Sequence, residues 1–131
     1  MIVVDTNIVA YLYLESEFTA RAEAQLRSDP DWAVPLLWRS EFRNILAGAI
    51  RRKALSFDDA RQILTEAESL LASGEHEVGS QQVLELVRDS DCSAYDCEFI
   101  ALAKQLGVKL VTMDSKLLKA FPKLALPLPA V

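Results

Sequence analysis

The sequence opens with MIVVDTN, residues 1–7, and a second stretch of the same kind, KLVTMD, spans residues 109–114. Each is a short aliphatic run that leads to an aspartate. Aliphatic and β-branched residues in so short a run predict a strand that is buried on both faces. Asp5, Thr6 and Asn7 are residue types that cap helices, so we expect the first strand to end at Asp5 and a helix to begin there.

The segments outside these two stretches alternate between helical and extended patterns. Apolar spacing and capping residues predict helices over residues 18–27, 35–53, 56–72, 80–88 and 93–106, and another that begins at 114–118. Short strands are expected at 33–34, 75–78 and 109–112, and the prolines after residue 121 limit the tail to coil or an edge strand. This alternation predicts an α/β fold: a single domain over residues 1–131, with a central parallel sheet of about four to five strands flanked by helices on both faces.

The composition is that of a globular protein. Hydrophobic residues make up 51% of the 131 residues and charged residues 25%, a balance that excludes a disordered chain. No apolar run approaches the ~20 residues that a membrane helix needs, so we expect no membrane association. The N-terminus lacks the basic leader and long apolar stretch of a signal peptide, and we therefore expect a cytoplasmic protein.

The cysteines and the net charge restrict the chemistry further. Cys92 and Cys97 are expected to be reduced thiols, and a zinc site is not expected because His76 is the only histidine and no CxxC pair exists. The net charge of −5 argues against binding a nucleic acid. If four of the 19 acidic residues gather around metal ions, however, 15 remain against 14 basic residues, and the rest of the surface is nearly neutral.

Two aspartates follow strands that we expect to be central in the sheet. Asp5 comes directly after the first strand, and Asp114 comes shortly after the strand at 109–112. In open parallel sheets, ligands bind beyond the carboxyl ends of the strands, where the strand order reverses. We therefore expect both carboxylates to emerge at the same edge of the sheet.

Two further acids lie on apolar helix faces. Glu41 stands four residues after Leu37 and four before Ile45, so the three share one face of the predicted helix. Asp96 is followed three and four positions later by Phe99 and Ile100. A carboxylate on such a face is costly unless something compensates it.

Four gathered carboxylates suit hard divalent cations such as Mg²⁺ or Mn²⁺. Two such ions can bind a phosphodiester, activate a water molecule and stabilise the leaving oxygen. Side chains that could orient the carboxylates through hydrogen bonds are those of Thr6, Asn7, Thr112 and Ser115. Each acid also has a simpler interpretation, as a helix cap or first-turn acid for the aspartates and as a solvated or ion-paired side chain for Glu41.

Four stretches in this order resemble the PIN-domain family, and within it the VapC-type toxins. They are VVDTNI at residues 3–8, SEFRNIL at 40–46, SAYDC at 93–97 with ALA at 101–103, and LVTMD at 110–114. The resemblance covers nearly the whole chain. It departs from the family at Cys97, where a small residue such as alanine is usual, and this departure does not touch the acids.

The resemblance implies an endoribonuclease, the toxin of a type II toxin–antitoxin system, that uses Mg²⁺ or Mn²⁺ and hydrolyses RNA with a metal-activated water. It implies a homodimer and a cognate antitoxin protein as partner. Carried over by position, Asp5, Glu41, Asp96 and Asp114 are the catalytic and metal-binding acids, and Thr112 and Ser115 occupy supporting positions.

Other α/β proteins remain as alternatives from the residues alone. A phosphoacceptor domain of the receiver type has an acidic Mg²⁺ site, but it needs adjacent acids after the first strand and an acceptor aspartate after a mid-chain strand. A phosphatase of the haloacid dehalogenase type needs Asp-x-Asp where this chain has Asp5-Thr6-Asn7. A non-catalytic binding module on the same fold is the third alternative.

Overall fold

Five parallel strands form one sheet, in the order β3-β2-β1-β4-β5, in the computed structural model, which describes residues 1–131. The strands are β1 (Ile2–Val4), β2 (Trp32–Pro35), β3 (Glu75–His76), β4 (Leu110–Val111) and β5 (Ala125–Leu126). The chain extends the sheet from β1 to β3 in one direction and then returns to place β4 on the other side of β1. The strand order therefore reverses between β1 and β4, which is the place where parallel α/β sheets bind ligands.

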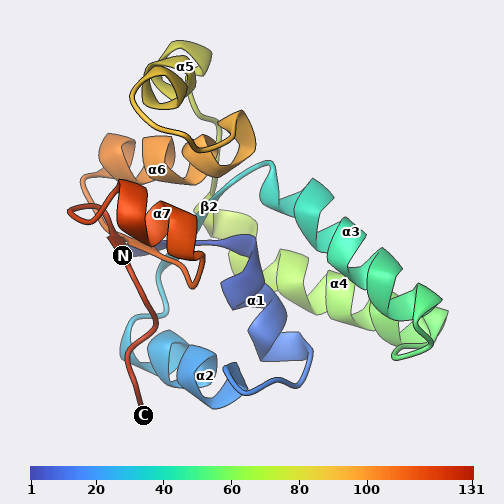
Figure 1. Cartoon of the computed structure of the whole chain (residues 1–131). Helices are drawn as coiled ribbons and strands as arrows, with labels where there is room; N and C mark the ends of the chain where they lie inside the picture. Colours follow the sequence, from blue (N-terminus) through green and yellow to red (C-terminus); the bar gives the residue numbers. More distant parts are fainter.

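Seven α-helices and one short 3₁₀ turn surround the sheet (Figure 1). They are α1 (Thr6–Tyr13), α2 (Thr19–Ser28), α3 (Trp38–Arg51), α4 (Phe57–Leu71), the turn Ala72–Gly74, α5 (Ser80–Arg88), α6 (Ala94–Leu106) and α7 (Ser115–Ala120). Helices α5, α6 and α7 lie together on one side of the sheet, and α1 and α2 lie on the other (Figure 1). Helices α3 and α4 form an antiparallel pair that extends away from the rest of the molecule.

The two layers have separate apolar cores because adjacent residues of a strand face opposite sides of a sheet. Val4 and Val111 pack with side chains of α1 to α4, including Trp38 and Phe42. Their neighbours Val3 and Leu110 pack with side chains of α5, α6 and α7. Both cores pack against the central strands, so β1 and β4 are fixed in position by side chains on both faces of the sheet.

One ion-pair network fixes the start of α3 against the sheet. The guanidinium of Arg39 donates through Nε and Nη2 to the two carboxylate oxygens of Glu75 in β3, at 2.6 and 2.8 Å, and through Nη1 to Glu68 at 2.7 Å. The indole N–H of Trp38 donates to the same Glu75 at 2.8 Å. This network sets the position of the first turn of α3 relative to the sheet.

The predicted α/β fold with a parallel sheet and helices on both faces is confirmed. One helix boundary was wrong: Pro35 ends β2, and α3 begins at Trp38, because the sheet bonds between β2 and β3 continue through the Pro35–His76 pair. The strands predicted at 75–78 and 109–112 are each shortened to two residues. Cys92 and Cys97 are free and buried. None of the helices is long and apolar enough to span a membrane.

Candidate metal centre at the carboxyl edge of the sheet

Asp5 is the first residue after β1 and occupies the N-cap of α1. Its peptide N–H donates to the carbonyl of Val111, 3.0 Å away, so the end of β1 is bonded to β4. The carboxylate accepts a hydrogen bond at Oδ1 from the peptide N–H of Thr6, at 2.8 Å, and one at Oδ2 from the hydroxyl of Thr112, at 2.7 Å. The extended backbone of the N-cap therefore directs this side chain towards the residue that follows β4.

Glu41, in the first turn of α3, reaches the same edge from one helical layer. Its Oε1 accepts a hydrogen bond from the hydroxyl of Thr6 at 2.7 Å. Thr6 is only 3% exposed and contacts Asp5 through its peptide N–H and Glu41 through its hydroxyl. A single buried threonine thus fixes two of the four acids relative to each other.

Asp114 caps the N-terminus of α7. Its Oδ1 accepts hydrogen bonds from the peptide N–H groups of Lys116 and Leu117, at 2.9 and 3.1 Å. Its own peptide N–H donates to the hydroxyl of Thr112 at 3.0 Å. Thr112 is fully buried and donates the hydrogen of the same hydroxyl to Asp5, so it connects the acids that follow β1 and β4.

Asp96 approaches the edge from the opposite layer, in the first turn of α6. The hydroxyl of Ser93 caps this helix and accepts a hydrogen bond from the peptide N–H of Asp96 at 3.1 Å. Burial raises the pKa of the half-buried Asp96 carboxyl, and the charge of Asp114 raises it further. The side-chain hydroxyl of Ser93, acting on the carboxylate, and the charge of Lys116 lower this pKa.

The electrostatics show that the four acids share one region. Burial is the main cause that raises the pKa of Asp5; hydrogen bonds from Thr112 and Thr6 oppose it, and the charges of Asp96 and Asp114 add to it. Burial also raises the pKa of Glu41, against the hydrogen bond from Thr6, and the charges of Asp5 and Asp96 contribute. Like charges this close disfavour ionisation of one another.

None of the four acids has a basic ion-pair partner. The five ion pairs of the structure lie elsewhere and involve the N-terminus with Asp29, Arg39 with Glu68 and Glu75, Arg61 with Asp58, and Arg88 with Asp89. A group of carboxylates without cations is unfavourable by itself and needs a compensating positive charge. The all-oxygen donor set fits a hard divalent cation of the Mg²⁺ or Mn²⁺ type.

The carboxylate oxygens do not converge as a set of ligands. No three aspartate, glutamate, histidine or cysteine side chains are arranged to hold a metal ion. Both oxygens of Asp5 are turned to Thr6 and Thr112, and Oδ1 of Asp114 is turned to the first turn of α7. The acids therefore share one edge of the sheet, while the carboxylates of Asp5, Glu41 and Asp114 face hydrogen-bond donors rather than one common point.

The residues predicted to support the acids divide into two groups. Thr6 and Thr112 are buried and hydrogen-bonded to the acids, as described above. Asn7 and Ser115 are exposed, and their side chains make no hydrogen bond with any of the four acids.

The sequence reasoning missed Glu98, whose charge acts on Glu41 and whose own pKa is raised by burial. No local pattern indicates this role of Glu98, because its neighbours Cys97 and Phe99 point in other directions on the helix.

Comparisons with known proteins give one consistent result. A sequence model of the family described as PIN domain matches residues 2–124. The chain is 30% identical over 129 residues to Ribonuclease VapC3 of Pyrobaculum aerophilum, and the alignment covers 96% of this chain and 98% of that protein.

Two solved structures have a similar fold. A toxin–antitoxin complex from Klebsiella pneumoniae superposes with a TM-score of 0.70 at 15% identity, covering 100% of both chains. FitAcB from Neisseria gonorrhoeae superposes with a TM-score of 0.73 at 19% identity, covering 95% of this chain and 96% of that one. At such low identity these two likenesses concern the fold alone.

Proposed function

The chain belongs to the PIN-domain family, and from this premise we propose that it is a metal-dependent RNA endonuclease, the toxin of a type II toxin–antitoxin system. The observation that carries the proposal is the group of four carboxylates without an ion-pair partner at the point where the strand order reverses. The name of the relative from Pyrobaculum aerophilum, a ribonuclease, supports RNA as the substrate.

Asp5, Glu41, Asp96 and Asp114 are proposed to hold Mg²⁺ or Mn²⁺. Bound there, the cation would supply positive charge to a phosphodiester and lower the pKa of a water molecule. The structure supports this assignment through the oxygen-only donor set and the absence of ion-pair partners. Side chains that now face Thr6, Thr112 and the first turn of α7 would have to rotate to share one ion.

The other proposed roles follow from the hydrogen bonds. In the metal-free protein, Thr112 and Thr6 hold the side chains of Asp5 and Glu41 at the edge of the sheet, so that their negative charge stays near the place where the cation would bind. Glu41 uses only Oε1 in its bond with Thr6, which leaves Oε2 to position the attacking water or to accept its proton.

The test is cleavage of single-stranded RNA by purified protein with Mn²⁺, compared among the wild type, Asp5→Asn, Asp96→Asn and Asp31→Asn. The first two substitutions remove a proposed ligand and are expected to abolish cleavage, with the circular dichroism spectrum unchanged. Asp31 is exposed and remote from the four acids, so the matched variant is expected to cleave as the wild type does. Full activity in Asp5→Asn or Asp96→Asn would overturn the assignment of these acids, whereas no cleavage by the wild type together with no Mn²⁺ binding would favour a non-catalytic module.

Two partners belong to the proposal. The solved toxin–antitoxin complex of similar fold supports a cognate antitoxin, which we propose to bind this protein in the cytoplasm. We also propose a homodimer. Light scattering coupled to size-exclusion chromatography is expected to give twice the chain mass of 14.6 kDa. A mass of one chain would contradict the dimer.

A further inference from the structure

The acidic edge poses an electrostatic problem for an RNA nuclease. The protein carries a net charge of −5, and the proposed site gathers four of its carboxylates, which repel a phosphate strand before a metal ion is shared with it. A strand that binds here needs cations beside the acids. The basic side chains that could serve are those that lie at this edge and are free to bind a phosphate.

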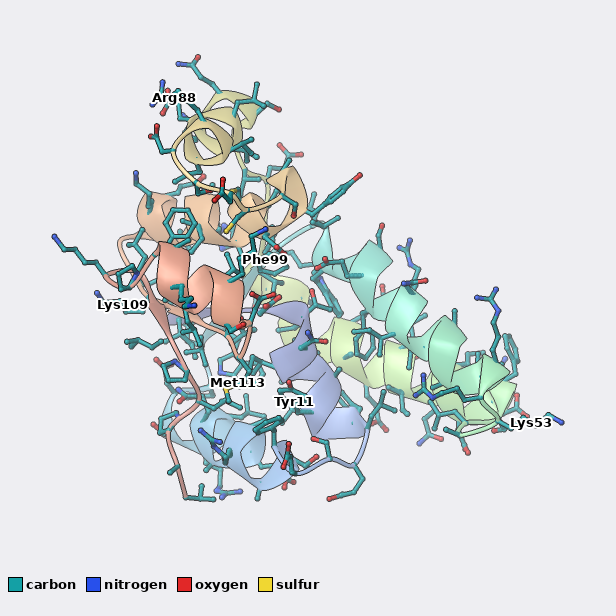
Figure 2. The ribbon with its side chains drawn as sticks, in the orientation of Figure 1. Tyr11, Lys53, Arg88, Phe99, Lys109 and Met113 are labelled. Atoms are coloured by element: carbon teal, nitrogen blue, oxygen red, sulfur yellow. The ribbon has the colours of Figure 1, made fainter.

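Many basic side chains are already engaged or lie away from the acids. Arg39, Arg61 and Arg88 are ion-paired with carboxylates. Arg21 and Lys109 donate to backbone carbonyls of the C-terminal segment. The basic residues at the end of α3 and just beyond it, residues 51–53, lie at the far end of the α3–α4 pair, where Figure 2 shows Lys53.

Helix α7 is different because it begins at one of the proposed ligands. Asp114 caps it, and Lys116 and Lys119 stand three residues apart, so both project from the same side of the helix. Both side chains are exposed and neither is in an ion pair, while Leu117 between them is buried in the core. Lys116 is also the one cation whose charge acts on Asp96.

The two lysines line a surface hollow of about 330 Å³. Its other wall is the segment 89–92, which leads directly into the cap of α6 and so to Asp96. Asp89 in this wall is neutralised by Arg88 at 2.8 Å, which leaves Asp91 as the one carboxylate of the hollow outside any ion pair. The hollow thus borders the segment that leads to Asp96, and it carries two ammonium groups outside any ion pair along one side.

We propose that the RNA strand leaves the acidic edge through this hollow between α7 and the segment 89–92. Lys116 and Lys119 each bind a backbone phosphate near the one that is cleaved. The proposal rests on the proposed function, because it names how the same site holds its substrate. A lysine ammonium is a mobile point charge that suits a phosphate without fixing the base sequence. The two lysines would therefore contribute affinity and strand position rather than sequence preference.

The test measures binding of a short, unstructured, fluorescein-labelled single-stranded RNA by anisotropy over a series of salt concentrations. All proteins carry Asp5→Asn so that the strand stays intact. Each phosphate contact in a single strand contributes about 0.7 to the slope of log K against log salt. Lys116→Gln and Lys119→Gln are each expected to lower the slope by about 0.7 and the affinity by about fivefold at ~0.1 M salt.

Two further variants separate a specific contact from a general charge effect. Lys53→Gln makes the same change of charge at the far end of the α3–α4 pair and is expected to leave slope and affinity as they are. Lys116→Arg keeps the charge and is expected to keep the slope. The proposal is wrong if Lys53→Gln weakens RNA binding as much as Lys116→Gln does. It is also wrong if Lys116→Arg loses as much affinity and salt slope as Lys116→Gln.

The cleavage assay distinguishes this proposal from the proposed function. With Asp5 restored, the double variant Lys116→Gln/Lys119→Gln is expected to raise KM at unchanged kcat, since the lysines bind substrate and transition state alike. If the wild type cleaves RNA and the double variant matches it in KM and in salt slope, the hollow is not the strand path. If the wild type cleaves no RNA, the proposed function fails, whatever the lysines bind.

Discussion

Thr112→Val tests the hydrogen bonds that connect the ends of β1 and β4. Valine has nearly the shape of threonine, so the substitution removes the hydroxyl and leaves the packing of this fully buried residue intact. That hydroxyl donates to Oδ2 of Asp5 at 2.7 Å and accepts from the peptide N–H of Asp114 at 3.0 Å. The variant therefore loses one bond to a charged group and leaves one peptide N–H without its partner.

The magnitude follows from these two losses. A hydrogen bond to a charged group contributes about 1.5–3 kcal/mol, and a polar group left without a partner costs about 1–3 kcal/mol when it is buried. Asp114 is only half-buried, so water can partly replace its lost partner. We expect the free energy of unfolding to fall by about 3 kcal/mol near neutral pH.

The loss of unfolding free energy in Thr112→Val should be smaller at acidic pH. The pKa of Asp5 is already raised by burial, so the protein gains stability as the pH falls through the range between its ordinary and its folded pKa. The bond from Thr112 lowers that pKa, and its removal raises the folded pKa further. The variant consequently gains more on acidification than the wild type, and the difference between them is smaller at about pH 5 than at about pH 7.5.

Urea denaturation at both pH values, without metal, measures this difference. Thr19→Val is the matched control, because Thr19 is 9% exposed and its hydroxyl donates to the carbonyl of Tyr11 and accepts from the peptide N–H of Ser16, with no carboxylate involved. The free energy of unfolding that Thr19→Val loses should be the same at both pH values. A loss below about 1 kcal/mol in Thr112→Val, or a loss that does not depend on pH, would refute this reasoning.

Three further outcomes are expected. Without metal, the urea midpoint of the wild type should rise from about pH 7 to about pH 5, because the raised pKa values of Asp5, Glu41 and Asp96 favour proton uptake by the folded state; a falling midpoint would contradict this. Mn²⁺ at about a hundredfold excess over its Kd should add about 2.7 kcal/mol to the free energy of unfolding of the wild type, and thermal melts should show this gain to be lost in Asp96→Asn. Gly74→Ala should cost about 3 kcal/mol in urea denaturation, because the new Cβ would lie 2.0 Å from the carbonyl oxygen of Trp32. Gly107→Ala, whose φ is 67° and whose Cβ meets no atom, should cost only about 1 kcal/mol of backbone strain, and equal losses in the two variants would contradict the contact argument.

Most element boundaries could be predicted because they depend on nearby residues. Ser56, Ser93 and Asp114 are capping residues in the sequence, and each accepts a hydrogen bond from a peptide N–H two or three residues later. Gly107 ends α6 in a left-handed conformation that glycine adopts without strain. The start of α3 was misplaced because the pairing of β2 with β3, which holds Pro35 in the sheet, joins segments that are distant in the sequence.

The contacts within the site could be predicted only in part. The strand ends predicted that Asp5 and Asp114 lie at one edge, since the parallel strands of one sheet have their carboxyl ends on the same side. The bonds of Thr6 to Glu41 and of Thr112 to Asp5 span 35 and 107 residues, and no local pattern reports them. Asn7 and Ser115 resembled Thr6 and Thr112 in chemistry, but their direction on the helix leaves them in solvent.

Local sequence patterns predicted most strands and helices, the residues that cap them, and two acids that follow central strands. These features follow from backbone conformation and from the periodicity of apolar residues over a few positions. Contacts between distant segments bring Glu41 from one layer and Asp96 from the other to the same edge, and place Lys116 of α7 beside them. The packing of two helical layers on one twisted sheet sets these approaches, because the position of each layer depends on all the side chains between it and the strands.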